Sequence, residues 1–121
     1  MESSIEHTDR MTVLNLSGRF DAHTAPPVRD VLTKLIDQGH QYILVDMAEV
    51  TFVDSTGFSV LVGGMKGCRR IGGDLVLMHL QQPVRIIFEL TRLDKAFDIY
   101  PDRPTAEATW RKMHSSRERK G

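Results

Sequence analysis

The sequence predicts a single α/β domain built on a small mixed β-sheet. Apolar runs rich in β-formers alternate along the chain with segments whose apolar residues recur at helical spacing. Strands separated by helices need crossover connections, so the later strands are expected to run parallel. The 121 residues, 40% of them hydrophobic, suit one core. The predicted order is β-β-α-β-α-β-α-β-α, with about four helices.

The first elements are a hairpin and a helix. Residues 4–8 and 11–17 alternate loosely between polar and apolar side chains, which predicts an antiparallel hairpin at the edge of the sheet. One helical face of residues 24–39 is apolar, at Val28, Val31, Leu32, Leu35 and Ile36. We expect Thr24 to cap this helix and Gly39 to end it.

A central strand and a second helix follow. Residues 42–47, "YILVDM", form a nearly continuous apolar run, which is typical of a strand covered on both faces. A second helical stripe starts after Ser55 and is ended by Gly72-Gly73. Its apolar members are Phe58, Leu61, Val62, Met65 and Cys68. We expect a loop between this strand and this helix.

The last third of the chain repeats the pattern. Residues 74–80 predict another buried strand, and Pro83 opens a short helix. The inner face of that helix is expected to be Val84, Ile87 and Phe88. Residues 97–100 predict a last short strand, and Thr105 is expected to cap a final helix. The domain is expected to cover residues 1–114.

Charge and cysteine content exclude several classes of function. The formal net charge is zero, which argues against a general nucleic-acid surface, although residues 111–121 hold five basic residues against one acidic. We expect residues 115–121 to be a basic, disordered tail. The single Cys68 excludes an internal disulfide, and no Cys/His cluster has metal-ligand spacing. We expect no cofactor, no membrane segment and a cytoplasmic location.

The segment "VTFVDSTGFSVLV", residues 50–62, interrupts an apolar stretch with polar side chains at one place. Asp54 or Ser55 can cap the helix that follows, and one such side chain is enough for a cap. Thr56 is a third side chain in this run that could cap the helix. Gly57 follows, and its missing side chain is expected to leave room for another molecule to approach. Capping alone and a binding role both remain open from these residues.

A serine hydrolase is a remote alternative. The nucleophile elbow Gly-x-Ser-x-Gly is absent around Ser55, because the first glycine is missing and the second arrives one place early. Nothing in the sequence brings any of the five histidines to this serine. We therefore expect a protein that is not an enzyme.

Ser55 fits a residue that is modified by another protein. A serine at a helix start lies at the positive end of the helix dipole, where a phosphate is tolerated. A phosphate adds about 1.5 to 2 negative charges, and a partner that buries the bare hydroxyl would then have to desolvate them. Ser59 and Val60 lie off the apolar stripe and are expected to face such a partner, whereas Phe58 and Leu61 are expected in the core.

Three blocks of the chain resemble the STAS domain of bacterial anti-sigma-factor antagonists. They are "LSGRFDAHTAPPV", "YILVDMAEVTFVDSTGFSVLV" and "GGDLVLMHLQQPVRIIFELTRLDKAFDIY", and the likeness spans about residues 5–114. The resemblance implies that Ser55 is phosphorylated by an anti-sigma factor with serine-kinase activity. The unphosphorylated protein would bind that factor, free the sigma factor and so regulate transcription indirectly. A serine phosphatase would reset Ser55.

The resemblance also implies a switch surface. Asp54 and Gly57 match motif residues of the family, and Asp21 matches an aspartate near the phosphorylated serine. Thr56 takes a place often filled by serine. With Ser59 and Val60, these residues make up the expected partner-binding surface. Other STAS domains serve as scaffolds or ligand-binding modules without phosphorylation, and such a module is the alternative function.

Overall fold

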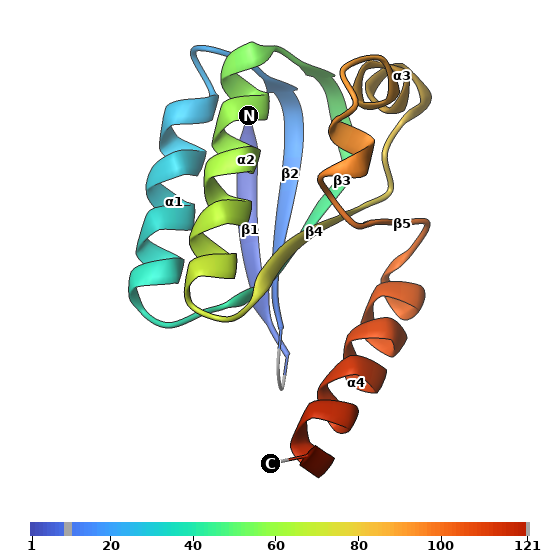
Figure 1. The fold of residues 1–121 in the computed structure, drawn as a ribbon. Helices are drawn as coiled ribbons and strands as arrows, with labels where there is room; N and C mark the ends of the chain where they lie inside the picture. Colours follow the sequence, from blue (N-terminus) through green and yellow to red (C-terminus); the bar gives the residue numbers. More distant parts are fainter. Residues whose placement is uncertain (9–10, 121) are drawn as a thin grey trace.

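A five-stranded mixed sheet forms the centre of the domain, and its strands lie in chain order (Figure 1). The computed structural model describes residues 1–8 and 11–120, with side chains described as far as Lys112. The strands are β1 (Glu2–His7), β2 (Thr12–Phe20), β3 (Tyr42–Val53), β4 (Asp74–Met78) and β5 (Ile99–Tyr100). β1 is antiparallel to β2, and every other neighbouring pair is parallel. The predicted edge hairpin and parallel strands are confirmed.

Helices follow the strands in the predicted order. They are α1 (Ala25–Asp37), α2 (Ser55–Arg70), α3 (Gln82–Leu90) and α4 (Arg103–Lys120), with a short 3-10 helix η1 (Leu93–Lys95) that the sequence did not predict. In Figure 1, α1 and α2 lie side by side against one face of the sheet. Gly64 and Gly67 of α2 lie against Leu32 and Ile36 of α1, so the two helices pack closely together.

Both faces of the sheet are covered at the first half of β3 and along β4, where consecutive apolar residues are fully buried: Ile43, Leu44 and Val45 in β3, and Leu75, Val76 and Leu77 in β4. Successive side chains of a strand point to opposite faces. Leu14, Val45 and Leu77 belong to the core under α1 and α2, whereas their neighbours belong to a second core under α4. That second core comprises Met11, Val13, Leu44, Val76, Met78, Ala106 and Trp110. The prediction of a central β3 covered on both sides is confirmed.

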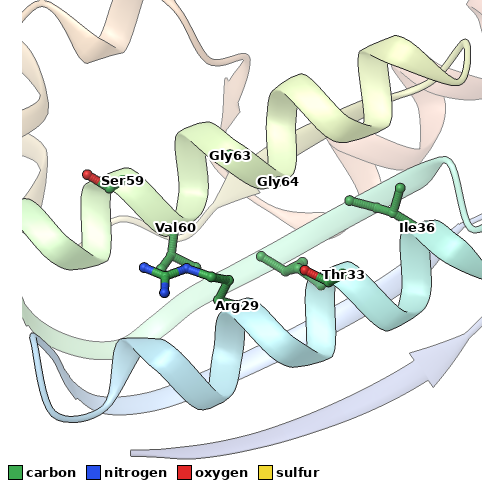
Figure 2. A pocket seen from close by; sticks show the side chains of 8 residues that line it. Arg29, Thr33, Ile36, Ser59, Val60, Gly63 and Gly64 are labelled. Atoms are coloured by element: carbon green, nitrogen blue, oxygen red, sulfur yellow. The ribbon is translucent and has the colours of Figure 1, made fainter.

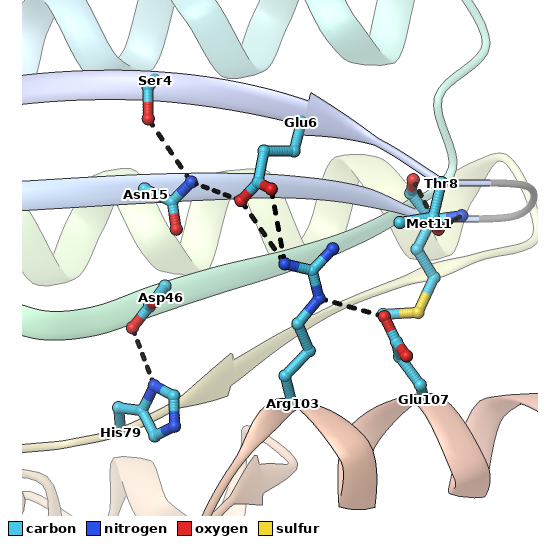
Figure 3. A network of polar contacts seen from close by, with 9 residues as sticks. All are labelled: Ser4, Glu6, Thr8, Met11, Asn15, Asp46, His79, Arg103 and Glu107. Atoms are coloured by element: carbon cyan, nitrogen blue, oxygen red, sulfur yellow. Dashed lines mark hydrogen bonds and ion pairs between the residues drawn. The ribbon is translucent and has the colours of Figure 1, made fainter.

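Polar contacts add to the packing of α4 on the sheet (Figure 3). Arg103 lies 3.0 Å from Glu107 in the same helix and 3.4 Å from Glu6 of β1. All three side chains are partly exposed, and ion pairs between exposed side chains contribute little to stability. Apolar burial of Trp110 and Ala106 therefore holds α4 in place.

Two predicted helix caps are wrong. The Thr24 side chain makes no capping bond to α1, because its hydroxyl donates to the Arg19 carbonyl at 2.6 Å and accepts from the Asp21 N–H at 2.8 Å. α4 begins at Arg103, earlier than expected. There the carboxylate of Asp102 accepts a hydrogen bond from the Thr105 N–H at 2.8 Å.

The loop expected between the central strand and α2 is also absent. β3 continues to Val53 because its second half pairs with β2, and Asp54 alone separates strand from helix. The tail expected over 115–121 lies outside the residues whose side chains the structure describes. In the described part of the chain, no helix has the length and apolar character needed to cross a membrane.

Candidate functional site: the start of α2

Asp54 caps α2 and ties it to the loop after β2. One carboxylate oxygen accepts a hydrogen bond from the Gly57 N–H at 3.0 Å, which satisfies a helix donor that has no partner within the helix. The other oxygen accepts from the Ala22 N–H, also at 3.0 Å. The Asp54 N–H donates in turn to the Phe20 carbonyl at 3.2 Å. Three bonds from one residue therefore fix where α2 begins.

Ser55 is left free by this arrangement. It is the first residue of α2 and is exposed. Because Asp54 makes the cap, the Ser55 hydroxyl is not needed for it, and among the described residues it bonds to no other side chain or backbone group. A free hydroxyl stands at the positive end of a 16-residue helix, which is a favourable position for an added negative charge.

Asp21 lies in the same corner, in the turn that Asp54 holds. Its Oδ1 accepts hydrogen bonds from the N–H groups of His23 at 3.0 Å and Thr24 at 3.2 Å. Hydrogen bonding to the charged form, from His23 above all, lowers the pKa of the Asp21 carboxyl. Arg19 is 3.7 Å away on the other oxygen. The structure thus brings Asp21 and Asp54, which are far apart in sequence, to one end of the sheet.

Gly57 does not leave room for a partner, so that expectation is wrong. A Cβ at this position would lie 2.6 Å from the Phe20 carbonyl oxygen and 2.9 Å from a methyl group of Val53. The space that the missing side chain provides is filled by the end of β2. Gly57 is therefore buried under the surface, and Thr56 beside it is half-buried. The missing side chain of Gly57 lets the end of β2 pack closely against α2.

Val60 is also not the exposed residue that was expected. Only 3% of it is exposed, because α1 packs beside α2 and widens the buried face of that helix beyond the predicted stripe. Ser59, one position earlier, is exposed as predicted. Phe58 and Leu61 are confirmed as core residues: Leu61 is fully buried, and Phe58 packs edge-on against Phe88 with ring centroids 4.9 Å apart.

Histidine placement gives no support to hydrolase chemistry at Ser55. His7 and His40 both contact the Thr12 hydroxyl, and His79 pairs with Asp46 at 3.0 Å (Figure 3). Of the four histidines whose side chains are described, none hydrogen-bonds Ser55. The Ser55 hydroxyl therefore has no histidine base in hydrogen-bond contact among the described residues.

Fold and site together define a small α/β domain that presents a serine beside two carboxylates at one end of its sheet. The STAS domain family model matches residues 2–106. The anti-sigma-B factor antagonist of Bacillus subtilis is 34% identical over 86 residues, which cover 71% of this chain and 78% of the relative.

Solved structures share the fold. A Thermotoga maritima protein superposes with a TM-score of 0.86 at 22% identity, covering 90% of this chain and 94% of its own. The Bacillus cell fate determinant SpoIIAA in its phosphorylated form gives a TM-score of 0.71 at 21% identity. This superposition covers 89% of this chain and 99% of the SpoIIAA chain. The chain belongs to the STAS domain family.

Some residues of this surface could not be found from sequence. The Ala22 N–H that Asp54 binds comes from a residue with no polar side chain. Arg29 and Thr33 of α1 line a hollow beside Ser59, and only the packing of α1 against α2 places them there. No pattern in the sequence marks either contribution.

Proposed function

We propose that this chain is an anti-sigma-factor antagonist whose binding to an anti-sigma factor is switched by phosphorylation of Ser55. The observation that carries the proposal is the free, exposed hydroxyl of Ser55 at the start of α2, next to a cap made entirely by Asp54. The names of the curated relatives support the same class of partner. The protein acts by binding and is not itself an enzyme.

The bare form of Ser55 is the binding form. The partner covers the start of α2, with Thr56 and Ser59, and the adjoining turn with Asp21, which Asp54 ties to the helix through the Ala22 N–H. Gly57 and Val60 are buried and shape this surface from beneath. Because Asp54 holds the turn and the helix together, the surface is already formed before the partner arrives, which lowers the entropic cost of binding.

Phosphorylation would end binding through charge. A phosphate adds about 1.5 to 2 negative charges to a corner that already holds the Asp21 and Asp54 carboxylates. Burying that group under a partner without a cation to pair it would cost several kcal/mol, and about 1.4 kcal/mol is tenfold in affinity. The fold would tolerate the phosphate because it lies at the helix N-terminus.

The kinase in this scheme is the anti-sigma factor itself, which has serine-kinase activity, and a serine phosphatase removes the phosphate. When Ser55 is bare, the antagonist occupies the anti-sigma factor and the sigma factor is released. Transcription is therefore regulated without contact between this chain and nucleic acid. The same fold has been solved in a phosphorylated form in SpoIIAA, which is compatible with this scheme.

The test compares Ser55→Ala and Ser55→Asp for binding to the anti-sigma factor of the source organism, measured by calorimetry. We expect Ser55→Ala to bind like the bare protein, and Ser55→Asp to bind at least tenfold more weakly while remaining folded by circular dichroism. Ser3→Asp, at an exposed serine on β1, makes the same charge change elsewhere and should leave affinity unchanged. Equal affinities for the two Ser55 variants would count against the switch, and self-association without partner binding would favour a scaffold.

A further inference from the structure

A hollow lies between α1 and α2, beginning one helical turn after Ser55 (Figure 2). Its volume is about 240 Å³. Its apolar lining includes Leu32 of α1 and Val60 of α2. Polar side chains at its border are Arg29, Thr33 and Ser59, and Gly63 leaves open space because it has no side chain. The hollow is therefore an apolar depression with a hydrogen-bonding border, which is the usual composition of a recognition site.

Gly63 has no packing role inside the domain. A Cβ on Gly64 would lie 2.9 Å from Leu75, and one on Gly67 would lie 2.9 Å from Ile36, so these glycines let α2 pack closely. A Cβ on Gly63 would meet nothing within 4 Å. Glycine in a helix interior costs stability relative to alanine, and here no internal contact compensates. A glycine in this place suits the close approach of another molecule.

Arg29 is one of several cations that have no partner among the described residues. Arg19, Arg69 and Arg103 each lie within ion-pair distance of a carboxylate. Arg29 is exposed, and it makes no ion pair or hydrogen bond with the described residues. In Figure 2 its guanidinium reaches from α1 toward Val60, over the hollow. A guanidinium with five free donors at the border of an apolar depression is well suited to bind a carboxylate.

We propose that this hollow docks a segment of the anti-sigma factor that carries an aspartate or glutamate. Arg29 pairs with the carboxylate, Gly63 admits the segment's backbone, and the apolar floor at Leu32 and Val60 takes a neighbouring aliphatic side chain. The inference rests on the proposed function, because Ser59 borders the hollow and lies one turn from Ser55. A partner seated over Ser55 thereby extends into it.

Photocrosslinking in cells of the source organism tests this docking. A benzoylphenylalanine replaces Thr33, which is exposed and lines the hollow, and the adduct is sequenced by mass spectrometry. We expect an adduct to a segment containing aspartate or glutamate, and its loss when Arg29→Glu is added. Lys34→Glu, an exposed cation on the same helix outside the hollow, should leave the adduct in place. No adduct, or one that survives Arg29→Glu, would overturn the proposal.

Affinity measurements separate this inference from the switch. With the purified anti-sigma factor we expect Arg29→Glu to weaken binding at least tenfold, Arg29→Lys to weaken it less, and Gly63→Ala to weaken it while raising the melting temperature. Unchanged affinity for Arg29→Glu together with a clear Ser55→Asp effect would reject the docking site alone. An Arg29-dependent adduct to a protein other than an anti-sigma factor would overturn the docking proposal, which names an anti-sigma factor segment as the occupant, and a Ser55→Asp effect on anti-sigma factor binding would still support the proposed function.

Discussion

The Asp54 carboxylate accepts a hydrogen bond from the Ala22 backbone N–H at 3.0 Å, across 32 positions of sequence. With its other oxygen it caps α2 through Gly57. The turn after β2 and the start of α2 therefore form one unit, and Ser55 projects from it. A single carboxylate thus shapes the surface on which the proposed switch depends, while the adjacent hydroxyl is left free for modification.

Removing this carboxylate should destabilise the domain. Asp54→Ala loses the cap and the bond to Ala22, which together are worth about 1 to 3 kcal/mol of unfolding free energy. Asp54→Asn keeps one acceptor oxygen and should lose less. Urea denaturation measures the free energy of unfolding of both variants. The control is Asp30→Asn, on the exposed surface of α1, whose free energy of unfolding should lie within about 0.5 kcal/mol of that of the parent. Parental stability in Asp54→Ala would show that the two bonds contribute nothing.

Two glycines of α2 should respond to alanine in opposite ways. Gly57→Ala places a methyl group 2.6 Å from the Phe20 carbonyl, and such overpacking typically costs about 1 to 3 kcal/mol. Gly63→Ala meets nothing within 4 Å and should stabilise the free protein by about 0.5 to 1 kcal/mol through helix propensity. Thermal unfolding distinguishes the two. A stabilised Gly57→Ala would contradict the close packing of β2 on α2.

Periodicity was enough to predict the fold, because each helix and strand buries a regular face. The order of elements, the edge hairpin and the central position of β3 all follow from apolar spacing and from the crossover rule. Caps were harder to predict, because several side chains near a helix start can accept the same bond. At α1, Thr24 bonds to the preceding turn instead of the helix, and at α4 Asp102 takes the place expected for Thr105.

The candidate site was predicted only in part. Ser55 was correctly predicted to be exposed at the start of a helix, because the Asp-Ser-Thr-Gly run interrupts an apolar segment. The exposure of Val60 and the open space at Gly57 were wrong for one reason. Both residues face another element, α1 for Val60 and the end of β2 for Gly57, and single-helix periodicity carries no information about which elements pack together.

Acid should weaken the turn that carries Asp21. Backbone N–H donors at His23 and then Thr24 lower the pKa of Asp21 below its ordinary 3.8. The pKa of Asp21 is lower in the folded protein than in the unfolded chain. The charged carboxylate therefore stabilises the fold fully at pH values above the ordinary pKa, and this stabilisation is lost as the pH falls through the pKa of the folded protein. Asp21→Asn should therefore show a shallower loss of stability below about pH 4 than the parent protein. Urea midpoints measured across this range check it, and parallel curves for the two proteins would contradict it.

Cys68 should be unreactive in the folded protein. It is fully buried in α2, and burial, with a smaller effect of Asp74, raises the pKa of its thiol to about 12. The thiolate is the reactive form, so alkylation at pH 8 should be very slow in buffer and complete in urea. Mass spectrometry follows the adduct over time. Labelling at the same rate in both conditions would show that the core around Cys68 opens readily.

The charge switch on Ser55 is tested most directly by locating phosphate on the protein isolated from its native cells. Intact mass followed by fragmentation should show one phosphate at Ser55 in the free protein, and none in the protein that copurifies with the anti-sigma factor. Phosphatase treatment of the free fraction should restore binding. A phosphate confined to Thr56 or another residue, or a phospho-Ser55 protein that still binds the partner, would contradict the switch.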